Sequence, residues 1–301
     1  MTDISHMIRQ SEASTWDFCR RLWFLSYFMS LTPNYPEGRR MPSSKGKRDY
    51  GTVLHGGAEA LHKGATMQEA ELARAATLDE LRNLVPVPDL PELSKAEDPA
   101  WWDIDRYTKS MLSSYNMWLE SGVEAGNRTL AVEEAWTMPL PNIDATMYGK
   151  HDLVYYSYNE NGVIVDDVKT VASFEPVHRA NFQVRTYALA WWRLTGEMPV
   201  KGGNRQVKRV LSESADNCES VLIPITEPIL LAHEVQLEAR ATEILTARTK
   251  TITDPTIYPR PNRDCSWRCP FGDVCVMIDD LDDFEFILEQ NYFVREEGEN
   301  E

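Results

Sequence analysis

The chain has 301 residues, 43% of them hydrophobic, which is enough to bury one large core or two modest ones and excludes disorder over most of the length. Its formal net charge of −16 argues against indiscriminate binding to nucleic acid, because a surface that binds phosphates is rich in lysine and arginine. The first ten residues lack the apolar run of a secretory signal, and no apolar run reaches the ~18 residues of a membrane span. We therefore expect a cytoplasmic protein with reduced cysteines.

The first predicted element is a helix over residues 11–31. Ser11 or Ser14 is its expected N-cap, since a serine hydroxyl accepts a hydrogen bond from a free backbone N–H of the first turn. Cys19 falls inside this helix and is therefore expected in a packed element.

Three further helical patterns follow. One begins near Thr52 and carries His55, and the others cover residues 67–84 and 99–121. We interpret residues 66–125 as a helical insertion before the core.

The sequence pattern changes at residue 129, where strands begin to alternate with helices. We expect strands at 129–140, 147–158, 163–171, 206–211 and 219–225, and helices at 176–195 and 228–250. This order predicts an α/β or α+β fold in one domain over residues 1–301, with its core at 129–250.

Charge is unevenly distributed, with acidic residues gathered at the C-terminal tail, residues 290–301. Basic residues form two stretches: Arg39, Arg40, Lys45, Lys47 and Arg48, and then Lys201, Arg205, Lys208 and Arg209. The first stretch is our leading candidate for a narrow DNA channel and the second is the next. The alternative for both is a solvated loop.

Two of the predicted strands carry a set of residues suited to phosphodiester hydrolysis. Because side chains alternate along a strand, Asp167 and Lys169 point to one face and Asp166 to the other. If Asp152 on the neighbouring strand faces the same side, two carboxylates and an ammonium converge. Carboxylates hold Mg2+ or Mn2+, and a lysine orients water or offsets developing charge. The alternative is a half-exposed hairpin with alternating charges.

Histidines offer a further metal ligand. His55 lies near the start of its helix, where a ring nitrogen could complete the coordination of the metal. His62 and His151 are weaker candidates, and a structural histidine is the alternative in each case.

Other polar side chains are placed to reach the same groove. Gln183 and Tyr187 are spaced i, i+4 on the helix after the lysine strand. The alternative is an amphipathic helix that packs Tyr187 into the core. One of Glu133 and Glu134 is expected to face the site, but spacing does not choose between them.

Four of the five cysteines lie near the two ends of the chain, and we call them the bracketing cysteines. Cys19 lies near the start, and Cys265, Cys269 and Cys275 lie in a loop at residues 260–280. Four thiolates hold either zinc or an iron-sulfur cluster, and the asymmetric spacing favours a [4Fe-4S] cluster over zinc. Unliganded buried cysteines are the remaining alternative.

Taken together, these motifs resemble the RecB-like branch of the PD-(D/E)XK nuclease superfamily. Within it, they are similar to iron-sulfur members such as AddB-type nuclease domains, CRISPR-associated exonucleases and phage-encoded relatives. The resemblance runs from residue 11 to residue 275. It implies a restriction-endonuclease-like core, with a central mixed sheet flanked by helices.

The resemblance also implies a role for each motif. The metal ligands would be His55, Asp152 and Asp167; Lys169 would be the catalytic lysine; Gln183 and Tyr187 would position DNA or water; and Cys19, Cys265, Cys269 and Cys275 would hold a [4Fe-4S] cluster. The implied activity is Mg2+- or Mn2+-dependent exonuclease action on single strands or DNA ends, in recombination, replication, repair or phage DNA metabolism.

Two alternatives remain. One is a non-enzymatic iron-sulfur or zinc module that binds DNA ends or docks onto a replication or recombination partner. The other is a sequence-specific restriction endonuclease, which leaves the cysteines unexplained. A homo-oligomer is left open.

Overall fold

The computed structural model describes residues 6–33, 47–83, 99–261, 265, 269–280 and 283–294. Arg39, Arg40 and Lys45 of the first basic stretch, and the acidic tail after Val294, lie outside the described residues. The chain groups into two compact units. Unit 1 comprises Met1–Gly38, Pro139–Gly149 and Glu234–Glu301, and unit 2 comprises Arg39–Met138 and Lys150–His233. The prediction of one domain over residues 1–301 stays a prediction.

Unit 2 is built on a mixed sheet. Its strands are β3 (Asn127–Pro139), β4 (Thr146–Ser157), β5 (Gly162–Val171), β6 (Lys201–Lys208) and β7 (Cys218–Pro224). β3 pairs with β4, β4 pairs antiparallel with β5, β5 pairs parallel with β6, and β6 pairs antiparallel with β7. The predicted fold class, a mixed sheet flanked by helices, is confirmed.

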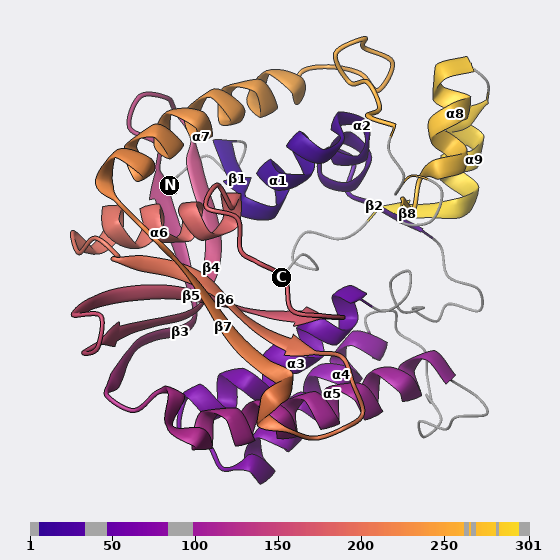
Figure 1. The fold of residues 1–301 in the computed structure, drawn as a ribbon. Coiled ribbons are helices and arrows are strands. Elements are labelled where there is room, and N and C mark those ends of the chain that lie inside the picture. Colours follow the sequence, from indigo (N-terminus) through magenta and orange to yellow (C-terminus); the bar gives the residue numbers. More distant parts are fainter. Residues whose placement is uncertain are drawn as a thin grey trace. The chain divides into compact units, whose positions relative to one another are not determined.

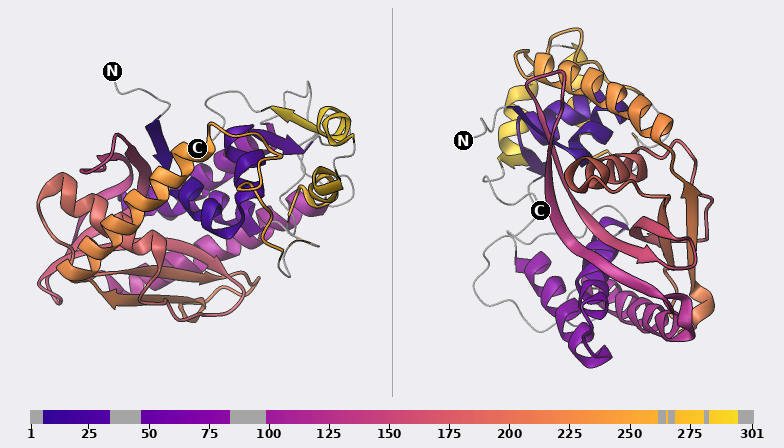
Figure 2. Two further views of the ribbon diagram at one scale, coloured as in Figure 1. Left: turned by 90° about the horizontal axis from the view of Figure 1, so that it is seen from above. Right: turned by 90° about the vertical axis from the view of Figure 1, so that its left-hand side faces the viewer.

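Helices cover both faces of these strands (Figures 1 and 2). One face carries α3 (Lys47–His62), α4 (Met67–Asn83) and α5 (Pro99–Trp118), and α6 (Phe182–Thr195) lies on the other. Two shorter elements complete the unit: a π-helical turn at Leu119–Val123 after α5, and a 3-10 turn at Ala215–Asn217 before β7.

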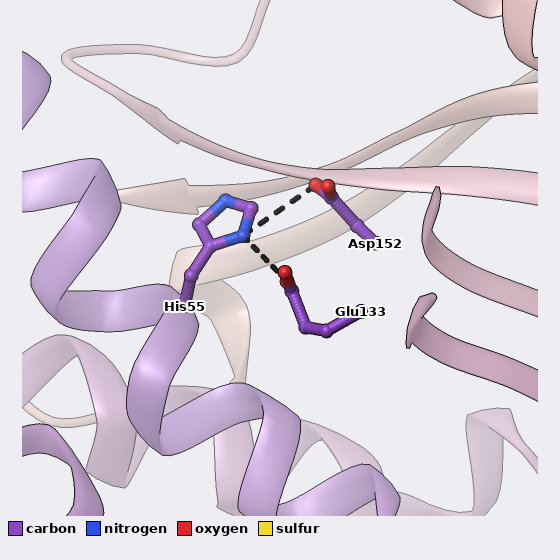
Figure 3. Close-up of side chains that lie close together, drawn as sticks. All are labelled: His55, Glu133 and Asp152. Carbon is purple, nitrogen blue, oxygen red and sulfur yellow. Dashed lines mark hydrogen bonds and ion pairs between the residues drawn. The ribbon is translucent and has the colours of Figure 1, made fainter. Parts of the chain in front are cut away.

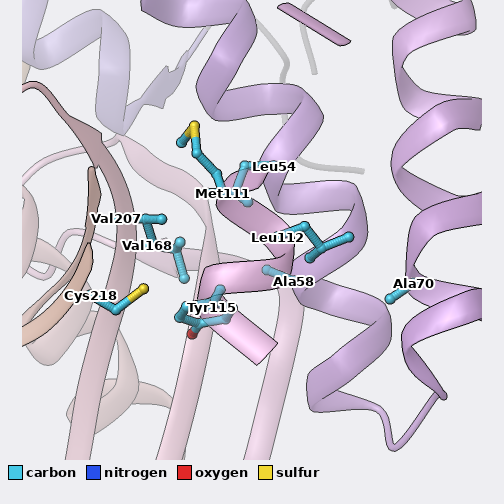
Figure 4. Packing of buried hydrophobic residues seen from close by; sticks show 9 residues of the cluster. All are labelled: Leu54, Ala58, Ala70, Met111, Leu112, Tyr115, Val168, Val207 and Cys218. Atoms are coloured by element: carbon cyan, nitrogen blue, oxygen red, sulfur yellow. The ribbon is translucent and has the colours of Figure 1, made fainter. Parts of the chain in front are cut away.

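Alternation along β5 divides its side chains between these two layers. Val168 faces the α3 to α5 layer, where it packs with Leu54, Met111 and Tyr115 in the buried cluster of Figure 4. Its neighbour Asp167 faces α6 instead. The strand therefore presents Asp166 and Val168 to one helical layer and Asp167 and Lys169 to the other.

A pair of glycines lets α3 pack closely against α4 and α5. A Cβ atom on Gly56 would lie 2.1 Å from the Thr77 hydroxyl of α4, and one on Gly57 would lie 2.7 Å from a Leu112 methyl of α5. A larger residue at either position would have to displace a neighbouring side chain. This packing fixes the position of His55, which directly precedes the pair.

Unit 1 is mostly helical. It contains β1 (Met7–Arg9), α1 (Gln10–Phe18), α2 (Arg20–Trp23), a π-helical turn at Phe24–Phe28, β2 (Leu31–Pro33), the part of α7 (Glu227–Ala247) from Glu234 onward, α8 (Gly272–Asp280), α9 (Phe284–Asn291) and β8 (Tyr292–Val294). β1 pairs parallel with the first residues of β4, and β2 pairs antiparallel with β8. Among the described helices, none is long and apolar enough to span a membrane.

The first predicted helix is wrong in two respects. Cys19 adopts an extended backbone, with φ −162° and ψ 117°, and separates α1 from α2. The N-cap is Arg9 rather than Ser11 or Ser14, because Glu12 accepts a hydrogen bond from the Arg9 backbone N–H at 3.3 Å.

Two predictions in the core are also corrected. The helix expected from residue 176 begins at Phe182, because the Asn181 side chain accepts a hydrogen bond from Val184 N–H and caps the helix there. The second basic stretch lies mainly in β6 rather than in a solvated loop. Arg205 is 2% exposed and cannot contact DNA from that position.

Candidate active site

Three side chains from separate elements of unit 2 converge at one point. His55 comes from α3, Glu133 from β3 and Asp152 from β4, and each contributes one ligand atom to a group whose atoms all lie within 4.8 Å of one another. His55 Nδ1 is 3.0 Å from Glu133 Oε1 and 3.6 Å from Asp152 Oδ2 (Figure 3). Two carboxylates and an imidazole therefore face a common centre.

The orientation of the imidazole is set by its other nitrogen. His55 Nε2 lies 2.7 Å from the Val168 carbonyl oxygen, which can only accept a hydrogen bond, so Nε2 carries a proton. In the neutral ring, Nδ1 then holds the lone pair that faces Asp152 and Glu133. This is the arrangement of a metal-binding histidine whose second nitrogen donates to a backbone carbonyl.

The charges at this point are strongly coupled. Burial raises the pKa of Asp152 well above its usual range, and Asp167 raises it further. Burial lowers the pKa of His55, but Asp152 and Glu133 outweigh that effect and raise it to about 9. A proton on His55 thus offsets part of the negative charge when no cation is present, and a divalent cation would take over that role.

Asp167 contacts the remaining predicted residues. Its Oδ1 accepts hydrogen bonds from Lys169 Nζ and from Gln183 Nε2, both at 3.0 Å. Gln183 Nε2 also lies 2.9 Å from the Tyr187 hydroxyl. Burial lowers the pKa of Lys169, but Asp167 and Asp152 outweigh it and raise the pKa above the usual value. The amine is therefore an ammonium at neutral pH.

The donor set fits a hard divalent cation. Asp167 Oδ2 is buried and makes no hydrogen bond to a described residue, although Lys169 Nζ lies 2.7 Å away. Carboxylate oxygens with one imidazole nitrogen suit Mg2+ or Mn2+. Asp167 is not a member of the three-residue group, so Glu133 stands closer to His55 and Asp152 than the predicted third ligand does.

Glu133 is the residue that sequence reasoning left undecided. Its backbone is in the left-handed region with φ 49°, which is rare for a residue other than glycine, and its side chain forms an ion pair with Lys150 at 2.7 Å. Glu134 is exposed. The left-handed backbone at residue 133 interrupts the alternation of side chains along β3. Alternation alone therefore cannot show which of the two glutamates faces the site.

The two weaker histidine candidates lie elsewhere. His62 Nε2 is 2.8 Å from the Tyr115 hydroxyl, and His151 Nε2 is 3.0 Å from the Tyr187 carbonyl oxygen. Burial lowers the pKa of each to about 4. Both are neutral core histidines.

A buried ion pair supports β5 on its other face. Arg205 Nε donates to Asp166 Oδ2 at 2.9 Å, and Asp166 Oδ1 accepts a hydrogen bond from the Asp167 backbone N–H at 3.2 Å. Asp166 is therefore committed to Arg205 rather than to the metal group.

The four bracketing cysteines all belong to unit 1. Cys19, Cys265 and Cys269 line a cavity of about 310 Å³, and Cys275 Sγ lies 3.6 Å from a guanidinium nitrogen of Arg21. Burial raises the pKa of Cys269 and of Cys275. Among the described residues, these sulfurs do not form a close ligand group like that of His55, Glu133 and Asp152.

Comparisons with known proteins give the family. None of the curated proteins matches the chain. A solved structure titled "Crystal structure of SSO0001" is similar at 18% identity with a TM-score of 0.30, over 74% of this chain and 83% of that chain. The family model of the PD-(D/E)XK nuclease superfamily matches residues 9–276. The chain belongs to the PD-(D/E)XK nuclease superfamily.

Proposed function

We propose that this protein is a Mg2+- or Mn2+-dependent DNA exonuclease that acts on single strands or DNA ends. The observation that carries the proposal is the convergence of His55, Glu133 and Asp152 beside the Asp167 and Lys169 pair. Family membership supports metal-dependent nuclease activity. Exonuclease action is supported by the charge of −16, which disfavours a broad DNA-binding face and favours entry of an end.

Each residue of the site has a distinct role in the proposed reaction. His55, Asp152 and Asp167 would hold the ion, with Glu133 beside them. A bound Mg2+ or Mn2+ lowers the pKa of a water and offsets charge on the phosphate. Lys169, as an ammonium, stabilises the negative charge that develops on the phosphate rather than acting as a base. Gln183 holds Asp167 in place through its 3.0 Å hydrogen bond.

The test of this activity compares DNA substrates that have free ends with closed circles that have none. Wild-type protein is incubated with Mg2+ or Mn2+ and with end-labelled linear single strands, linear duplex and closed single-stranded circles. We expect metal-dependent loss of label from linear strands and intact circles. Cleavage of circles at an equal rate would indicate an endonuclease. Binding without cleavage in every metal would favour the non-enzymatic module.

We further propose that Cys19, Cys265, Cys269 and Cys275 bind a [4Fe-4S] cluster. Three of these thiols line one cavity of about 310 Å³, which supports a shared site for a multinuclear cluster. Such a cluster requires a reducing compartment, which agrees with the predicted cytoplasmic location. An oligomer, or a replication or recombination partner, stays a prediction.

The cluster is tested by metal analysis of anaerobically purified protein. We expect about four irons per chain and broad absorption near ~400 nm. Cys275→Ser should lose the iron, whereas Cys218→Ser, a buried thiol of unit 2, should keep it. One equivalent of zinc in colourless protein would instead show that the four cysteines bind zinc. Equal iron content in the two variants would show that Cys275 is not a ligand of the cluster.

A further inference from the structure

The loop at residues 172–181 leaves β5 directly after the site residues and leads into α6. Gln206, a buried residue of β6, holds this loop in place: the Glu175 backbone N–H donates to its Oε1 at 2.8 Å, and its Nε2 donates to the Glu175 carbonyl oxygen. In the β5–β6 register, Gln206 is the partner of Lys169. The loop is therefore fixed next to the lysine of the site.

Four cations gather around this loop. Arg179 and Arg185 are joined by a hydrogen bond from Arg185 Nε to the Arg179 carbonyl oxygen at 2.9 Å. Lys208 is the register partner of Val171, the residue at which β5 ends, and Arg209 donates its backbone N–H to the Val171 carbonyl oxygen. Within the described part of the chain, none of these four cations forms an ion pair with a carboxylate.

Two other cations of the sheet are paired. Lys150 pairs with Glu133 and Lys201 with Glu160, each at 2.7 Å. Acidic residues outnumber basic ones by 47 to 31 in the whole chain, and Glu175 lies on this same loop, yet the four cations form no ion pair with a described carboxylate, which makes them a candidate site for an anion. The Nε atom of Arg209 is also buried, with no hydrogen-bond partner in the described ranges.

An aromatic ring lies within the same group. The Lys208 ammonium sits 3.9 Å from the centroid of Phe174, and the Arg209 guanidinium lies 5.7 Å from that of Tyr50. Tyr50 belongs to the first turns of α3, and a Cβ on the next residue, Gly51, would lie 3.9 Å from Thr170 Oγ1. The start of α3 and the end of β5 therefore meet where the cations lie. Cations with aromatic rings are the usual composition of a surface that binds a single strand.

We infer that Arg179, Arg185, Lys208 and Arg209, with Phe174, bind the phosphates and one base of the DNA strand that enters the site. This inference rests on the proposed nuclease function and names the path of its substrate. Arg179 lies on the loop that follows β5, Arg185 lies in the first turn of α6, and Lys208 and Arg209 lie at the end of β6 beside Val171. A DNA strand bound there would have its next phosphates beside Asp167 and Lys169.

The test compares two variants of the protein. One loses three of the four cations of the proposed site, and the other loses three cations elsewhere in unit 2. The first variant carries Arg179→Ala, Lys208→Ala and Arg209→Ala. The control carries Arg106→Ala, Lys109→Ala and Arg128→Ala, three exposed cations of α5 and β3 that also form no ion pair with a described carboxylate. Both lose the same net charge. Binding of a labelled single-stranded oligonucleotide is measured by anisotropy at several salt concentrations, without divalent metal.

We expect the first variant to bind at least about 10-fold more weakly at low salt. The slope of log K against log salt should become shallower by about 0.7 for each phosphate that the variant no longer neutralises. The control should stay within about 2-fold of wild type. Phe174→Leu should weaken single-strand binding by more than about 5-fold, with little effect on duplex. If the triple variant does not fold, Arg179→Ala alone, an exposed loop position, gives the same test, with the slope change expected for about one phosphate.

Two outcomes would overturn the inference, and they can be told apart. If wild-type protein cleaves DNA while the first variant keeps its affinity and slope, or the control loses as much, the path lies elsewhere and the nuclease function stands. If wild-type protein neither binds nor cleaves DNA in any metal, the proposed function fails together with the path.

Discussion

At the scale of single residues, Glu133 is the least expected member of the site. It combines a left-handed backbone with contacts to His55 and Lys150. Strained positions of this kind persist where the surroundings determine them, often at functional sites. The strain and the position of the carboxylate both indicate that Glu133 supports metal binding.

Glu133→Gln is therefore expected to weaken Mn2+ binding by about 10- to 100-fold, the usual effect of changing a residue that contacts a ligand. Isothermal titration of the protein with Mn2+ measures this without reference to activity. Glu134→Gln, an exposed neighbour on the same strand, is the control and should bind as wild type. Unchanged affinity in Glu133→Gln would leave the residue a purely structural role.

A second prediction at this scale concerns pH. Burial lowers the pKa of His151 to about 4, whereas the unfolded value is 6.5, so the unfolded state binds more protons between these values. Stability is thus lost as pH falls from 6.5 to about 4, by on the order of 3 kcal/mol for this residue. His62 adds a loss of the same sign. His151→Gln should reduce the fall by about half in denaturant titrations, and His178→Gln, at an exposed loop position, should not change it.

At the scale of elements, α3 positions His55 through its close contacts with α4 and α5. Gly57→Ala gains up to ~1 kcal/mol of helix propensity but places a methyl 2.7 Å from Leu112, and overpacking of this kind costs ~1–3 kcal/mol. We expect a net loss in the free energy of unfolding, measured by denaturant titration. Gly51→Ala, in the same helix with 3.9 Å of space, should be neutral or stabilising. If both variants are stabilised to the same extent, the packing argument is wrong.

The sequence was most informative where a pattern is long and regular. The strands expected around residues 129–171 and the helices expected at 67–84, 99–121 and 228–250 agree with β3 to β5, α4, α5 and α7 to within three residues at each end. The break at Cys19 was missed because its apolar neighbours continue a helical pattern that tertiary packing overrides. The helix expected at residue 176 instead follows Asn181, since a side-chain cap decided the boundary.

The same limits apply to the site. Strand alternation placed Asp167 and Lys169 on one face, and Asp152 was expected beside them on the neighbouring strand. His55, on a helix, was named as a metal ligand by the family resemblance. Glu133 could not be, because a single left-handed residue changes which face a side chain takes. Arg205 looked like part of a basic stretch, but its partners Asp166 and Glu124 are distant in sequence and bury it.

At the scale of the whole molecule, metal binding should stabilise the fold. An ion that binds only the native state adds ~2.7 kcal/mol at a concentration about 100 times its Kd. We expect Mn2+ to raise the melting temperature of wild-type protein, and Asp152→Asn to abolish the rise. An equal rise in both proteins would place the binding site away from Asp152.

We propose that Asp167 and Lys169, beside the metal group, take part in the cleavage of phosphodiester bonds. The most direct measurement is the rate of cleavage of an end-labelled single strand in Mn2+ by wild type and by Asp167→Asn. We expect the variant to lose more than about 100-fold in rate, at unchanged fold and DNA affinity. Cleavage by Asp167→Asn at the wild-type rate would contradict it.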